Sequence, residues 1–160
     1  VGIVGCGDSN NGNSLELAVA AMERHRVNPD VQHAGCGYFR SLSHDAECCE
    51  RMVRSKRARV VSCVVDSIRW NSGMLDVMME GSVFLQNMMV VSPNTTIESI
   101  LRFNKRRRSS SDDRPDLLPT LLDAVRTNRD EPDLAFSVFG LLSNVTLHPK
   151  GISVLTRGSE

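Results

Sequence analysis

The sequence predicts an all-α protein assembled from a repeated helical unit. An apolar pattern of 12 residues occurs three times, and the second and third copies begin 46 and 57 residues after the copy before them. In each copy the large apolar residues fall at positions i, i+7, i+8 and i+11, a spacing that places them on one face of a helix. The three copies are Val31–Leu42, Val77–Met88 and Leu134–Val145.

Each copy is preceded by another amphipathic helix, whose apolar residues recur at the same offsets of 46 and 57. Asn28 and Pro29 separate the first of these helices from the copy that follows, because proline cannot continue a helix. We expect these preceding helices at about Ser14–Arg26, Val60–Asn71 and Leu117–Asn128.

A shorter helix is expected after each copy. The unit then contains two long helices and one short helix and spans about 40 to 47 residues, a length typical of helical repeats. The short helices are expected at Asp45–Ser55, Thr95–Phe103 and Lys150–Arg157.

The repeat predicts one domain over residues 1–160, with units at about 14–57, 58–103 and 115–158. In such an array each unit packs on its neighbours, so no central core is required. The Gly-rich start, residues 1–13, lacks the strands of a nucleotide-binding βαβ unit and is expected to be a flexible loop. Because the chain starts without methionine and ends inside a predicted helix, we expect it to be part of a longer protein.

A mobile basic insertion is expected at residues 104–115, between the second and third units. Four consecutive cations are followed by three serines and two aspartates, with no apolar anchor. One interpretation is a tolerated surface loop. The other is a regulatory loop recognised by a basophilic kinase, a nuclear-import receptor or an acidic surface. Its residues would be Lys105, Arg106, Arg107, Arg108, Ser109 and Ser110.

Composition and charge narrow the class of protein. Apolar residues make up 41% of the chain and charged residues 24%, as in a soluble folded protein. The 19 Lys and Arg balance the 19 Asp and Glu, so nucleic acid is not an expected partner. No apolar run approaches the roughly 20 residues of a membrane span, and an odd count of 5 cysteines predicts no disulfide framework. We expect a cytoplasmic or nuclear protein with no membrane partner.

The residues that could carry chemistry do not form a complete site. His33, Cys36 and the pair Cys48–Cys49 supply only fragments of a four-ligand zinc pattern, so no metal is expected. The 4 histidines are scattered, with no serine or cysteine signature of nucleophilic catalysis around them. The sequence therefore predicts a protein that is not an enzyme and needs no cofactor.

Three short strings at the same register carry a family resemblance: Gly37–Ser43, Phe84–Met88 and Gly140–Thr146. They resemble the last helix of armadillo repeats, where a Leu-x-Asn-Leu-Ser type of ending is usual. The helices before them resemble the middle helix, so the resemblance covers nearly the whole chain. Membership of this armadillo or HEAT-like group implies a right-handed α-solenoid of about three repeats.

The resemblance also implies a binding surface. In importin-α and β-catenin, asparagines at one position of the last helix line a concave groove and clamp the main chain of an extended peptide. An amide suits this role because it offers both a donor and an acceptor, whatever the ligand's side chains are. The equivalent residues are Ser41, Asn87 and Asn144, of which the serine departs from the pattern. Alternatively, the two asparagines cap or brace the turn between helices.

Neighbouring positions complete the candidate groove. Arg40 and Gln86 flank these positions and could select acidic or polar ligands, and Ser143 holds the same place in the third copy. Importin-α often has tryptophan four residues before each asparagine, and here that aromatic shelf is absent. The residues at that place are Gly37, Val83 and Gly140.

We therefore expect a non-catalytic scaffold that binds an extended peptide or partner protein along a concave face. The alternative is a structural spacer or oligomerisation segment of a larger multidomain protein, which would self-associate through its end repeats.

Overall fold

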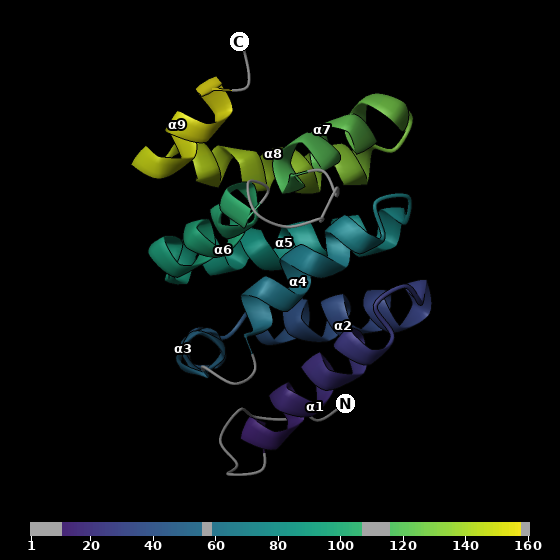
Figure 1. Cartoon of the computed structure of the whole chain (residues 1–160), viewed down its shortest axis with the longest axis vertical. Helices are drawn as coiled ribbons and strands as arrows, with labels where there is room; N and C mark the ends of the chain where they lie inside the picture. Colours follow the sequence, from purple (N-terminus) through teal and green to yellow (C-terminus); the bar gives the residue numbers. More distant parts are fainter. Residues whose placement is uncertain (1–10, 56–58, 107–115, 158–160) are drawn as a thin grey trace.

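The computed structural model describes residues 11–55, 59–106 and 116–157, and every secondary-structure element within these ranges is a helix. The helices follow the chain from one end of the molecule to the other (Figure 1). The all-α prediction is thereby confirmed. The bounds are α1 Asn11–Arg24, α2 Pro29–Leu42, α3 Ala46–Arg54, α4 Val60–Trp70, α5 Leu75–Val91, α6 Pro93–Arg106, α7 Leu117–Thr127, α8 Pro132–Thr146 and α9 Pro149–Arg157.

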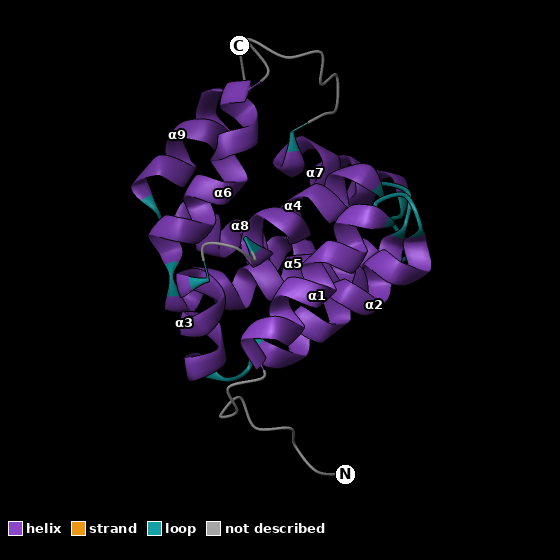
Figure 2. Ribbon diagram, turned by 60° about the horizontal axis from the view of Figure 1, so that its bottom comes forward, coloured by secondary structure: helices purple, strands orange, loops and turns teal. Residues whose placement is uncertain are grey.

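The helices that carry the repeated 12-residue pattern, α2, α5 and α8, form one layer. α5 packs between α2 and α8, and the three lie side by side. A second layer contains α1, α4 and α7, in which α4 packs on α5 and also contacts its two neighbours. The remaining helices, α3, α6 and α9, lie along one edge of the molecule (Figure 2).

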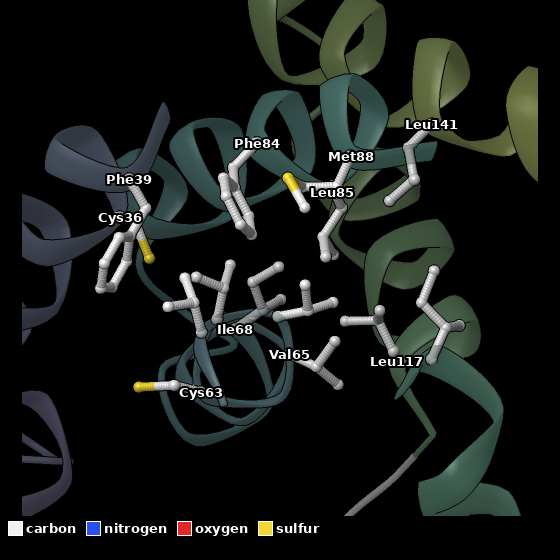
Figure 3. Packing of buried hydrophobic residues seen from close by; sticks show 14 of the residues in the cluster. Cys36, Phe39, Cys63, Val65, Ile68, Phe84, Leu85, Met88, Leu117 and Leu141 are labelled. Atoms are coloured by element: carbon white, nitrogen blue, oxygen red, sulfur yellow. The ribbon is translucent and has the colours of Figure 1, made fainter. Parts of the chain in front are cut away.

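The core lies between these two layers, where the predicted apolar stripes meet. Phe84, Leu85 and Met88 of α5 point toward Val65 and Ile68 of α4, and all five side chains are fully buried (Figure 3). The buried cluster extends from α1 to α8. Full burial of each large apolar side chain contributes about 1.5–3 kcal/mol, so the contacts between layers are a main source of stability.

The starts of α2 and α3 coincide with stop and cap signals in the sequence. The Asn28 side-chain oxygen accepts hydrogen bonds from the N–H groups of Asp30 and Val31, at 3.1 and 3.2 Å. A proline at the first position of α2 has no N–H that needs a partner. The Asp45 carboxylate accepts the N–H of Cys48 at 2.8 Å, which starts α3.

Tyr38 was expected on the buried stripe of α2, but its side chain is 37% exposed. Its equivalents Phe84 and Leu141 are fully buried, because each lies on a helix that has a preceding helix in the first layer. Among the described residues no helix precedes α2 in that layer. The Tyr38 hydroxyl instead lies 3.2 Å from the hydroxyl of Ser14 in α1.

α6 is longer than the short helix expected at Thr95–Phe103, since it spans Pro93–Arg106. The backbone of Lys105 and Arg106 therefore belongs to this helix and not to a loop, in keeping with the good helix propensity of both residue types. The rest of the expected insertion, residues 107–115, lies outside the described residues.

Candidate functional site

The nine residues expected to line a groove come from equivalent turns of α2, α5 and α8. None of them is buried: Ser41 and Ser143 are exposed and the other seven are partly exposed. None of them belongs to the buried cluster between the two layers. We call this region the three-helix surface, and it comprises Gly37, Arg40, Ser41, Val83, Gln86, Asn87, Gly140, Ser143 and Asn144.

Two polar contacts join α2 to α5 at this surface. Arg40 Nη1 donates to Glu80 Oε1 at 2.8 Å, and both side chains remain partly exposed. Asn87 Nδ2 donates to Ser43 Oγ at 2.9 Å. Because Arg40 is already paired, its charge is less available to select an acidic ligand than the sequence suggested.

Two further contacts join α5 to α8 through Gln86. The side chain of Asn144 donates to the Gln86 backbone oxygen at 3.2 Å. The Gln86 side chain lies against Gly140, where an added Cβ would stand 2.7 Å from its Oε1 atom. Glycine at this position therefore permits the close approach of the Gln86 amide to α8.

Ser41 makes a different kind of contact. Its hydroxyl donates to the backbone oxygen of Gly37 at 2.9 Å, one turn earlier in the same helix. Asn87 and Asn144, in contrast, each reach the preceding helix of the first layer and brace neighbouring helices instead of a turn.

The contacts that brace the helices use only part of the hydrogen-bonding capacity of the Asn87 and Asn144 side-chain amides. A primary amide has two N–H donors and one carbonyl acceptor, and the hydrogen bond described for each asparagine uses one donor. Among the described residues, one N–H and the oxygen of each side chain have no hydrogen-bond partner.

Sequence reasoning missed three residues beside the three-helix surface, which are Glu80, Ser43 and Phe136. Glu80 and Ser43 were missed as partners of Arg40 and Asn87, although Glu80 stands seven residues before Asn87 and so shares its helix face. Phe136 was missed as an exposed aromatic side chain next to the three-helix surface. It is 79% exposed and precedes Gly140 by four residues, so helical spacing alone places it one turn away on the same face.

A separate pocket of about 310 Å³ lies away from the three-helix surface, between α1, α2 and α4. Its charged groups are engaged with their neighbours. Arg59 lies 3.4 Å from Glu23, and the Arg26 guanidinium stands 5.7 Å from the ring centre of Trp70. Cys63 also lines this pocket.

The thiols of the core are poor nucleophiles. Burial raises the pKa of Cys36 to about 11 and that of Cys63 to about 12, from 9.0, so both stay protonated at neutral pH. Cys49 is a third free thiol. The backbone N–H of Cys48 donates to the Asp45 carboxylate at 2.8 Å.

The described residues contain no group of three or more His, Cys, Asp or Glu side chains that could hold a metal ion. In the expected regulatory loop, Arg107, Arg108, Ser109 and Ser110 lie outside the described residues. Among the helices that the structure describes, none combines the length and apolar character that a bilayer span requires.

Comparison with protein-family models, with curated proteins and with solved structures finds no match. The described residues thus define the class of protein only by its fold: an all-helical chain in which α2, α5 and α8 lie side by side.

Proposed function

We propose that this chain is a non-catalytic scaffold of the armadillo type, a right-handed superhelix of about three repeats, that binds an extended segment of a partner protein across the three-helix surface. The observation that best supports the proposal is that the residues of this surface occupy equivalent positions in three neighbouring helices. Equivalent positions of α2, α5 and α8 stand side by side, and two of the three hold an asparagine with unused hydrogen-bonding capacity.

The spacing suits an extended peptide that crosses the helices. Packed helices stand about 8–10 Å apart, and an extended chain advances about 3.3 Å per residue. One asparagine therefore meets the peptide main chain about every third residue. Each free amide oxygen accepts a peptide N–H and each free amide N–H donates to a peptide carbonyl, so the clamp is independent of the ligand's side chains.

Ligand selectivity would come from the remaining side chains. Phe136 offers an exposed aromatic face one helical turn from Gly140, which suits an apolar ligand side chain. The Arg40–Glu80 pair leaves the α2 end without a strong excess of either charge. The surface therefore favours a peptide that is bound mainly through its main chain and that places one apolar side chain near α8.

Selection from a random-peptide display library tests the proposal. Peptides that bind the full chain are expected to lose at least about tenfold in affinity for Phe136→Ala, because exposed aromatics at interfaces often dominate binding energy. Asn87→Ala and Asn144→Ala together should weaken every selected peptide, since the amides contact the main chain.

The matched control is Leu147→Ala, which removes an apolar side chain at the C-cap of α8 that is 80% exposed. Peptide affinity should not change in this variant. Circular dichroism and thermal melting must first show that the asparagine variants stay folded, because both residues also brace helices. Selected peptides that bind all folded variants as they bind the wild type would exclude the three-helix surface as the site.

A further inference from the structure

The pocket of about 310 Å³ between α1, α2 and α4 lies where the first unit of the array meets the second. Most of its lining residues come from α1 and α4, which pack on each other. The pocket therefore belongs to a boundary within the array and not to either of its ends. Its volume is at the lower limit of small-molecule pockets, about 300–1,000 Å³, so it suits a ligand with a single small ring system.

The deepest residues of the pocket are buried and mostly apolar. Met22 and Cys63 are 2% and 8% exposed, and their sulfur atoms stand 3.9 Å apart. Gln32 is 1% exposed, and its side-chain amide donates to the backbone oxygens of Met22 and His25. This part of the pocket therefore offers a ligand mainly van der Waals contact with polarisable sulfur atoms.

α4 lines the pocket with three residues that stand one helical turn apart. Ser62, Asp66 and Trp70 have the spacing i, i+4 and i+8, which places a hydroxyl, a carboxylate and an indole on one helix face. The Asp66 side chain is 39% exposed, Trp70 is 38% exposed and Ser62 is partly exposed. A ring that stacks on the indole therefore presents its edge to the carboxylate.

The segment after α1 supplies a cation to the same pocket. The Arg26 guanidinium stands 5.7 Å from the ring centre of Trp70, near the outer limit of about 6 Å for a cation–π contact. Arg26 is exposed, so its guanidinium can shift outward and cover a ring that enters beside the indole. Indole and guanidinium planes are both surfaces on which heteroaromatic bases stack.

This indole and this guanidinium are not features of the repeat. At the next unit boundary, the positions that correspond to Arg26 and Trp70 hold Ser72 and Thr127. The packing of one unit on the next therefore does not require either group.

The charges of the pocket favour a neutral ligand. Two carboxylates, of Glu23 and Asp66, and two guanidiniums, of Arg26 and Arg59, line it together. Arg59 lies 3.4 Å from Glu23, and both side chains are more than half exposed. The lining therefore has no excess of positive charge that would select a phosphate group.

We propose that this pocket binds a small, neutral, planar heteroaromatic ligand of the purine type, which presents N–H donors along one edge. The ring stacks on Trp70, Arg26 covers its outer face and the Asp66 carboxylate accepts the edge N–H groups. A carboxylate has about four acceptor positions, so Asp66 can accept two adjacent donors while it stays 3.6 Å from Arg69. Guanine presents two adjacent donors of this kind.

Trp70 is the only tryptophan of the chain, so its fluorescence reports what occupies the pocket. Guanosine should quench this fluorescence and saturate below about 1 mM, as expected for a small ligand at a partly exposed site. 1-Methylguanosine keeps the ring but lacks one edge N–H, and it should bind at least about tenfold more weakly. Equilibrium dialysis with the same two nucleosides should give the same ratio of affinities.

Three variants test the roles of the side chains. Asp66→Asn should remove the preference for guanosine over 1-methylguanosine, because an amide cannot accept two adjacent donors. Arg26→Ala should weaken the binding of both nucleosides by a similar factor, about three- to tenfold, because it removes the cover over the ring. Arg24→Ala is the matched control. It removes an exposed cation at the end of α1 that does not line the pocket, and it should bind both nucleosides like the wild type.

Thermal melting must show that Asp66→Asn is folded, since Asp66 also lies beside the buried Arg69. If this variant does not fold, the two nucleosides on the wild type and the Arg26→Ala variant decide the question. Guanosine that neither quenches Trp70 nor is retained in dialysis overturns the proposal, as does equal binding of the two nucleosides. A folded Asp66→Asn protein that keeps the preference for guanosine also overturns it.

This test is independent of the proposed peptide site. The variants change the pocket between α1 and α4, whereas the asparagines of the three-helix surface are untouched, so either proposal can fail without the other.

Discussion

Gly81 provides a sharp test of how closely α4 and α5 approach. An added Cβ at this position would stand 2.8 Å from both Cγ1 and Cδ1 of Ile68 and 3.3 Å from Cγ1 of Val64. Ile68 is fully buried, so its side chain cannot move away freely. Overpacking of this kind costs about 1–3 kcal/mol, while replacing glycine by alanine inside a helix gains about 1 kcal/mol. Gly81→Ala should therefore lower the free energy of unfolding by up to about 2 kcal/mol.

Gly37→Ala is the matched control. The added Cβ would approach Glu80 Oε2 at 3.5 Å, an ordinary contact, so the helix-propensity gain should remain and stabilise the chain by about 0.5–1 kcal/mol. The two variants should then differ by about 1–3 kcal/mol in urea unfolding, or roughly 2–12 °C in melting temperature.

A double-mutant cycle tests whether Ile68 causes the destabilisation expected for Gly81→Ala. Ile68→Val removes the Cδ1 atom that the new methyl group would meet, and by itself costs about 0.5–1.5 kcal/mol. In that background the cost of Gly81→Ala should shrink by about 0.5 kcal/mol or more. If Gly81→Ala stabilises the chain as much as Gly37→Ala does, α4 and α5 do not pack as closely as described.

Three further predictions concern local interactions. Asn28→Ala removes the cap of α2 and should lower the free energy of unfolding by about 1 kcal/mol in urea titrations. Glu80→Gln breaks the partly exposed ion pair with Arg40 and should cost at most about 1 kcal/mol, a difference that should disappear in high salt. The raised pKa of Cys36 predicts stability that is fully present below pH 9.0 and falls between pH 9.0 and about 11, because the unfolded thiol ionises first. Cys36→Ala should flatten that decline, and the pH dependence of the urea midpoint measures it.

The sequence contained enough local information to place most helices. The start of α2 at Pro29 follows from a proline and an asparagine cap whose partners are two and three residues away. The buried stripe of α5 follows from residues that share a helix face, such as Phe84 and Met88. The length of α6 was underestimated, because no proline or glycine marks its end before the basic residues begin.

The candidate site was predicted only in part. The positions of Asn87 and Asn144 on one surface follow from their common register in the repeat. The partner of Arg40 does not, since Glu80 lies 40 residues away and its reach depends on how α2 and α5 pack. Phe136 could have been found from its spacing to Gly140, because residues four apart share a helix face.

By itself the sequence determined that the chain is helical and where the apolar stripes lie, because the helical period and the capping contacts involve residues only a few positions apart. Only the tertiary structure decided that Asn87 reaches Ser43 and Asn144 reaches Gln86, across 44 and 58 residues of chain. It alone decided that Tyr38 and Phe139 lie exposed at opposite ends. A side chain's exposure depends on which helices stand beside it, and neighbours of that kind are set by packing between units.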